Sequence, residues 1–274
     1  MSRVLTANGS YLASARPYDI GLNGYPWCFA GWAKATSFPN ENQFIYCLSS
    51  FGTQNSTAGI RSRNTFTGDP ICSFERGSTG AEAYTNTTAA LSTTDWRLVW
   101  ARFISATSRN VGYVSVSGGD IHNVSSTTDV PTFDFAQADG ILVGGRMGPT
   151  GFDYQYTGKS GMFGVWKGTL PSDAELVTMA GTTDWTGIAS AGIVDIWDMS
   201  TSGNETGLVN SRVLTLSGTI AYDSDEPDLG EPDPGVVVSP ALTSVGAQAY
   251  VTTVSIISGA SSPLLHDGLL REFF

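Results

Sequence analysis

Short stretches in which apolar and polar residues alternate, with turn-forming residues between them, constrain this chain most. An alternation with a period of two residues predicts a strand that buries one of its faces. Clusters of Gly, Asn, Ser and Asp between the stretches predict turns. No long stretch follows the helical period, so the chain is predicted to be all-β with few, short helices. The predicted strands are residues 29–35, 44–51, 97–103 and 111–116, the last two forming a pair.

Residues 141–182 hold the most informative order of segments. A short apolar run meets a pair of glycines, a polar and aromatic loop follows, and a second strand is predicted at 161–166. A short helix is predicted next, because Ser172 can serve as its N-cap and Glu175 occupies the capping-box position.

This order resembles the end of a laminin-G-like domain of the concanavalin A-like lectin/glucanase superfamily. Residues 27–34 and 95–99 are similar to the early and middle Trp-containing strands of that family, and 113–118 to its Tyr-Val-Asp-Gly strand. The sequence departs from the family at Ser115, where Asp is common. The resemblance covers roughly residues 8–182 and implies a concanavalin A-like jelly-roll β-sandwich of antiparallel strands.

The composition changes twice towards the C-terminus, which predicts three parts. Residues 1–222 form the sandwich, with further strands at 193–199 and 212–216. Residues 223–235 contain six carboxylates and three prolines, which predict an extended, solvated linker. Residues 236–274 are apolar again and are predicted to be a C-terminal docking tail.

An apolar tail beyond a charged linker cannot fold alone, so it must pack on another surface. Two interpretations stay open. The tail returns to its own sandwich as an edge strand, or it adds a strand to a neighbouring subunit or assembly partner. The predicted assembly residues are Tyr250, Val251, Val254, Ile256, Leu269, Leu270, Phe273 and Phe274.

Charge and cysteine content exclude several classes of partner. The formal net charge is −11, which disfavours nucleic acid and anionic lipid as partners because both need a basic surface. The sequence lacks the run of about 18 apolar residues that membrane insertion needs, and its N-terminus shows no signal peptide. Cys28, Cys47 and Cys72 match no zinc pattern and predict buried free thiols.

The acidic linker contains a literal Glu-x-Asp-x-x-Glu spacing at Glu226, Asp228 and Glu231. The glucanase branch of the resembling superfamily uses this spacing on a strand, as nucleophile and acid/base. Here Pro227 and Gly230 interrupt it, and no apolar residues would bury it to tune the pKa values apart. The chain is therefore predicted not to be an enzyme. Residues 157–160, which end like a phosphate loop, are predicted to be an ordinary loop with Lys159 solvated.

A binding site is predicted in the loop 146–156, which carries Phe152, Asp153, Tyr154 and Tyr156. A sugar site needs an aromatic face for the apolar side of the ring and carboxylate or amide groups for its hydroxyls. The alternative is that Tyr154 and Tyr156 only pack on the sandwich edge. Some laminin-G-like domains bind Ca²⁺ through Asp side chains and backbone carbonyls, so the resemblance allows a Ca²⁺ site at Asp153 and Asp139.

Two functions follow from these predictions. The first is a non-catalytic structural protein of a bacteriophage virion, a head decoration or fibre-like subunit, made in the host cytoplasm. Its tail would bind other virion proteins or copies of itself in a homo-oligomer. The second is a carbohydrate-binding lectin module for a cell-surface glycan. A glycoside hydrolase is the less favoured alternative, and the virion assignment is an analogy at the level of the family.

Overall fold

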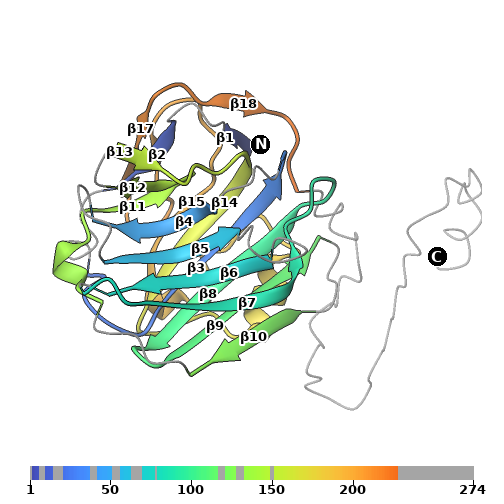
Figure 1. The fold of residues 1–274 in the computed structure, drawn as a ribbon. Helices are drawn as coiled ribbons and strands as arrows, with labels where there is room; N and C mark the ends of the chain where they lie inside the picture. The colour runs from blue at the N-terminus through green and yellow to red at the C-terminus, as the bar shows by residue number, and fades with distance from the viewer. Residues whose placement is uncertain are drawn as a thin grey trace, which may run out of the picture. The chain divides into compact units, whose positions relative to one another are not determined.

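Two antiparallel β-sheets of eight strands each pack face to face in the computed structural model of the chain (Figure 1). This arrangement confirms the predicted all-β sandwich. No helix among the described residues has the length and apolar character needed to cross a bilayer. The structure describes residues 2–5, 10–14, 21–37, 42–50, 56–62, 70–77, 79–116, 121–127, 133–148 and 151–227. The predicted tail, with all eight of its assembly residues, and the linker from residue 228 onward lie outside them.

Sheet A contains three of the four strands predicted in the first half of the chain, and the fourth, at 44–51, is β4 of sheet B. Its order is β10-β9-β8-β3-β14-β1-β18, and β15 also pairs with β14. The predicted pairing of 97–103 with 111–116 is confirmed, because β8 and β9 are antiparallel neighbours. The strands are β1 (Ser2–Leu5), β3 (Trp27–Ala35), β8 (Arg97–Ser105), β9 (Ser108–Ser115), β10 (His122–Ser126), β14 (Gly158–Lys167), β15 (Ile193–Trp197) and β18 (Ala221–Asp223).

Sheet B has the order β16-β17-β2-β11-β4-β5-β6-β7. A separate hairpin, β12 (Arg146–Gly148) with β13 (Gly151–Asp153), follows β11 in the chain. The strands of sheet B are β2 (Tyr11–Ala13), β4 (Gln43–Ser49), β5 (Thr57–Ser62), β6 (Pro70–Arg76), β7 (Glu82–Ala90), β11 (Gly140–Val143), β16 (Glu205–Thr206) and β17 (Val213–Ser217).

Stacked aromatic rings fill the space between the sheets. Tyr46 from sheet B stacks on Phe163 of sheet A with ring centroids 4.3 Å apart, and Phe163 stacks on Trp197 at 5.5 Å. The Tyr46 hydroxyl donates a hydrogen bond to the carbonyl of Trp32 at 2.8 Å, so its polar end is satisfied inside the core. Truncating a ring in such a core typically costs about 3–5 kcal/mol of stability.

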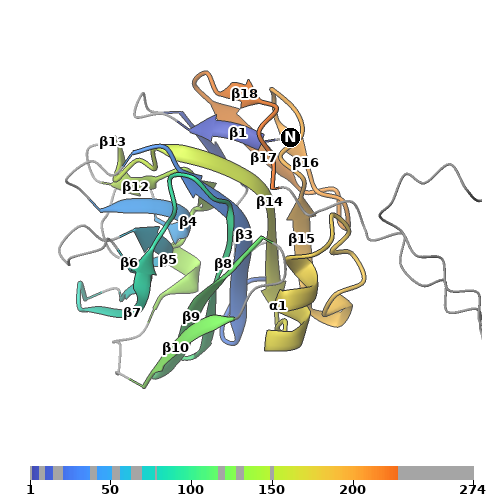
Figure 2. The same ribbon diagram turned by 90° about the vertical axis from the view of Figure 1, so that its right-hand side faces the viewer.

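The helix α1 (Asp173–Met179) lies on the outer side of sheet A, next to β14 and β15 (Figure 2). A second apolar cluster, to which Leu176 and Met179 of α1 belong, fills this outer face, and the 3-10 helix η3 (Ser190–Gly192) follows α1 in the chain. The predicted capping box is confirmed, because Ser172 accepts from the backbone of Glu175 and Glu175 accepts from the backbone of Ser172. Five buried tryptophans belong to this cluster: Trp32, Trp96, Trp100, Trp166 and Trp185.

The three cysteines are free and buried, as predicted. Burial raises the pKa of the Cys28 thiol to about 12, and it raises the pKa of Cys47 as well. Both thiols therefore stay protonated and unreactive at neutral pH.

A buried polar cluster interrupts the core between β6 and β9. Glu75 has no exposed surface, accepts a hydrogen bond from the Tyr25 hydroxyl, and lies 3.8 Å from the Arg109 guanidinium. Burial raises the pKa of Glu75 to about 7, although the Tyr25 hydrogen bond and the Arg109 charge oppose the shift.

The cluster predicts a pH-dependent stability. Because the folded pKa of Glu75 is above its unfolded value, the free energy of unfolding should fall by up to about 3 kcal/mol as the pH rises from 4.5 to 7. Glu75→Gln should flatten that slope in urea unfolding series, and Glu226→Gln on the exposed end of the described chain should leave it unchanged. Parallel slopes for wild type and Glu75→Gln would contradict the prediction.

Candidate functional site

The outer face of sheet B is built by strand register. Ala58 and Ile60 of β5 and Ile71 of β6 point into the core. Because side chains alternate along a strand, Gly59 and Arg61 of β5 point outward. Across the strands, Arg61 of β5 pairs with Cys72 of β6, which pairs with Asn86 of β7. The next row contains Gly59, Phe74 and Tyr84, and Phe44 of β4 lies opposite Arg61.

Arginine and aromatic side chains alternate on this face. The Arg61 guanidinium lies over the Phe74 ring, 4.2 Å from its centroid, and 6.0 Å from the rings of Phe44 and Tyr84. Phe44 and Phe74 meet edge to face at 5.4 Å. A planar cation stacked on rings is a stable arrangement for arginine. Phe44 and Phe74 are buried, whereas Tyr84 keeps 40% of its surface exposed.

The β12–β13 hairpin packs against the same face and extends it. Arg146 forms two hydrogen bonds to Asp153, at 2.9 and 2.8 Å, and its guanidinium lies 4.3 Å from the Tyr154 ring centroid. Met147 and Tyr154 pack on the apolar cluster around Phe44. We call the whole set the arginine–aromatic face: Phe44, Arg61, Phe74, Tyr84, Asn86, Arg146, Asp153 and Tyr154.

The structure brings two of the four predicted sugar-site residues into this face. Asp153 and Tyr154 are partly exposed there. Phe152 belongs to β13, where it pairs with Met147, and its side chain lies outside the described part.

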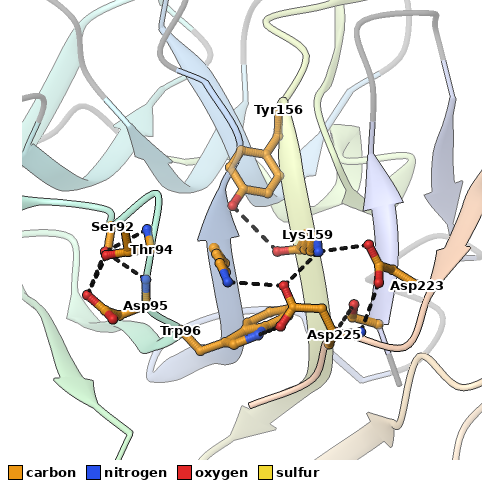
Figure 3. Close-up of polar contacts among 10 residues, drawn as sticks. Ser92, Thr94, Asp95, Trp96, Tyr156, Lys159, Asp223 and Asp225 are labelled. Carbon is orange, nitrogen blue, oxygen red and sulfur yellow. Dashed lines mark hydrogen bonds and ion pairs between the residues drawn. The ribbon is translucent and has the colours of Figure 1, made fainter. Parts of the chain in front are cut away.

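The prediction for Tyr156 is wrong, because its side chain has no exposed surface and belongs to the core. The backbone at Tyr154 turns with a φ of +48°, which breaks the alternation of the loop. The ring of Tyr156 then occupies the space above Gly158, where a Cβ atom would come within 2.4 Å of it. Its hydroxyl reaches the Lys159 carbonyl at 3.5 Å (Figure 3).

Sequence reasoning missed Arg61, Tyr84 and Asn86, which lie on strands that it did not predict. The binary pattern of these strands is weak because Ser73, Glu75 and Thr85 are polar and yet buried. The usable signal is the Phe74 to Arg76 stretch, whose aromatic and basic residues both point outward.

The described residues contain no group of three or more His, Cys, Asp or Glu side chains that could hold a metal ion. The two carboxylate oxygens of Asp153 each accept a hydrogen bond from Arg146. The predicted Ca²⁺ site at Asp153 and Asp139 therefore has no third acidic ligand in the described part of the chain.

The start of the acidic segment is docked on sheet A rather than solvated. Asp223 ends β18, which pairs with β1. Asp225 accepts hydrogen bonds from Lys34 at 3.0 Å, Lys159 at 2.6 Å and the Trp96 indole at 3.1 Å (Figure 3). The sandwich thus extends beyond the predicted boundary at residue 222, and Lys159 is an ion-paired strand residue instead of a solvated loop residue.

The pKa of Asp225 reflects the same three contacts. Partial burial alone would raise its pKa, but the hydrogen bonds from Lys159, Trp96 and Lys34 lower the pKa of Asp225 to about 2. The sequence did not reveal this contact because its partners lie far away in the chain.

The Arg146–Asp153 pair should hold the hairpin on the face. Asp153→Asn replaces a bidentate ion pair by one weaker hydrogen bond, and should lower the free energy of unfolding by about 1–2 kcal/mol. Hydrogen exchange of residues 146–153 should accelerate at the same time. Glu82→Gln, which removes the more exposed pair with Arg76 at 3.3 Å, should change stability by less than about 0.5 kcal/mol. Unchanged exchange in Asp153→Asn would contradict this role.

No family model and no curated protein matches the chain. Among solved structures, the chain is similar to a candidate carbohydrate-binding protein from Bacteroides ovatus, with a TM-score of 0.59 and 15% identity. The alignment covers 84% of this chain and 61% of that one, so this chain spans less than two thirds of its length.

A second similar structure is tailspike protein 2 of the Escherichia coli O157:H7 bacteriophage CAB120, with a TM-score of 0.51 and 10% identity over 72% of this chain and 26% of that one. The LG1-3 region of the laminin alpha2 chain aligns with a TM-score of 0.47 and 12% identity, over 60% of this chain and 30% of that one. The two antiparallel sheets and the likeness to the Bacteroides ovatus structure agree on an all-β jelly-roll sandwich. Similarity at these identities speaks to the fold alone.

Proposed function

We propose that the chain is a carbohydrate-binding module that binds glycans on the arginine–aromatic face. One observation carries the proposal: Tyr84 on the outer face of sheet B is 40% exposed, and its ring lies 6.0 Å from the Arg61 guanidinium and on the same strand as Asn86. A sugar ring stacks its C–H side on an aromatic ring, while its hydroxyls need such polar partners. The similarity to the Bacteroides ovatus protein supports the same class of ligand.

The two outer faces of the sandwich differ in a way that favours this location. Sheet A is covered by α1 and the tryptophan cluster, and Asp225 lies over its Lys34 and Lys159. On sheet B, the rings of Tyr84 and Tyr154 remain at least partly exposed.

We propose that the module binds glycans without cleaving them. A glycosidase needs two carboxyl groups placed about the scissile bond. On the arginine–aromatic face, Asp153 is committed to Arg146, and the neighbouring Glu82 is paired with Arg76. Glu226 of the glucanase-like spacing is exposed, whereas the general acid of a glycosidase is enclosed in an apolar pocket.

Tyr84 tests the binding proposal directly. Tyr84→Ala should weaken binding to the best ligand of a glycan array about tenfold, because stacking is lost, whereas Tyr84→Phe should retain most of it. Ile104→Ala, which truncates a side chain that is 46% exposed on sheet A, serves as the control. Bound oligosaccharide should be recovered intact by mass spectrometry. Wild-type affinity in Tyr84→Ala would contradict the location, and cleaved products would contradict a purely binding role.

A bacteriophage particle is our proposed setting for this module, where it would act as a non-catalytic structural subunit made in the host cytoplasm. The similarity to the phage tailspike, over 72% of this chain, supports the setting. Residues 236–274 would attach the module to other virion proteins or to copies of itself, as the sequence predicted.

Purified particles give the test of the virion setting. Labelled antibody against the chain should decorate particles in negative-stain images, and mass spectrometry of those particles should detect it. Absence from purified particles would contradict the virion setting and leave the glycan-binding proposal standing.

A further inference from the structure

The arginine–aromatic face and its edge carry three arginines, but the described residues provide carboxylates for two of them. Arg146 pairs with Asp153 at 2.8 Å, and Arg76 pairs with Glu82 at 3.3 Å. Arg61, which lies between them on β5, forms ring contacts with Phe44, Phe74 and Tyr84. No ion pair to Arg61 occurs within the described part of the chain.

Arg61 is also deeply buried for a charged side chain. It is 7% exposed, and its Nε–H is buried without a hydrogen-bond acceptor among the described residues. A desolvated cation without an anion is unfavourable, and stacking on Phe74 offsets only part of that loss. The position therefore has an unmet preference for an anionic acceptor.

Asn86 supplies a complementary unmet group in the same row. Its Oδ1 is buried and accepts no hydrogen bond from the described residues. Arg61 and Asn86 are separated only by Cys72 across the sheet, which places their Cα atoms about 10 Å apart. Tyr84 lies on the same strand as Asn86, two residues away and on the same side of the sheet. One ligand could thus satisfy an Arg donor and an Asn acceptor while it contacts an aromatic ring.

We infer that the arginine–aromatic face recognises a carboxylate-bearing sugar. The carboxylate binds side-on to Arg61, a neighbouring hydroxyl donates to Asn86, and the sugar ring contacts Tyr84. A planar carboxylate matches the planar donor fork of arginine, which a neutral hydroxyl does not. This inference rests on the proposed glycan-binding function and names the class of its ligand.

Matched ligands test the inference on the intact chain. Isothermal titration would compare an oligosaccharide that ends in a carboxylated sugar with the same oligosaccharide after reduction of the carboxyl to an alcohol. The acid form should bind about 10–100-fold more tightly, the range of a charge-assisted hydrogen-bonded pair. A sulfated analogue of the same oligosaccharide should bind more weakly than the carboxylated form.

Arg61→Met separates binding from folding. The variant should lose the preference for the acid form, yet its melting temperature should be unchanged or higher, because a buried charge without an anion is removed. Arg61→Lys retains the positive charge but not the planar pair of guanidinium donors, and it should lose most of the preference for the acid form. It replaces the Met variant in this test if the Met variant does not fold. Arg102→Gln, which alters an ion-paired arginine on the outer face of sheet A, should keep the preference.

Each other outcome has a distinct meaning. Equal affinity for the acid and reduced forms, or a preference for sulfate, would overturn the carboxylate inference and leave glycan binding intact. A retained acid preference in Arg61→Met would overturn the role of Arg61. Failure of every glycan to bind would overturn the inference together with the proposed function.

Discussion

The packing of rings between the sheets is the constraint on which the rest of this molecule depends. Tyr46, Phe163 and Trp197 stack in series across the interior, and this fixes which residues of each strand point inward. Because side chains alternate along a strand, the same register dictates what each outer face displays. The inward packing of the rings therefore also determines that tryptophans of β3 and β14 point to the outer face of sheet A and that Arg61 of β5 points to the outer face of sheet B.

The outer faces of the two sheets differ in what packs against them. On the outer face of sheet A, apolar side chains are buried because α1 and the loop that follows it pack over them. On the outer face of sheet B, Arg61 stacks on Phe74 and Arg146 stacks on Tyr154, so charged and aromatic side chains pack together there, and no helix in the described part of the chain covers them. A face of this kind is suited to ligands that are polar at their rim and apolar on one side.

Local signals made much of the fold predictable, and nonlocal contacts account for most of what was missed. Alternation predicted β3, β4, β8 and β9, and the Ser172–Glu175 capping box predicted α1. Alternation did not predict β5 to β7, because buried polar residues such as Glu75 interrupt the pattern and have their partners on distant strands. Composition indicated solvation for Asp225, but Lys34 and Lys159, remote in the chain, bind it. Tyr154 and Tyr156 look equivalent in the sequence, and one positive φ separates them.

The docking of Asp225 has a mechanical consequence. Tension applied to the chain beyond Pro227 reaches the sandwich first at this carboxylate, where donors from β3, β14 and Trp96 share the load. Next to this carboxylate, β18 pairs with β1 through backbone hydrogen bonds, and Arg3 of β1 forms an ion pair with the buried Glu205. The contacts of Asp225 must therefore break before the edge strand β18 can separate from β1.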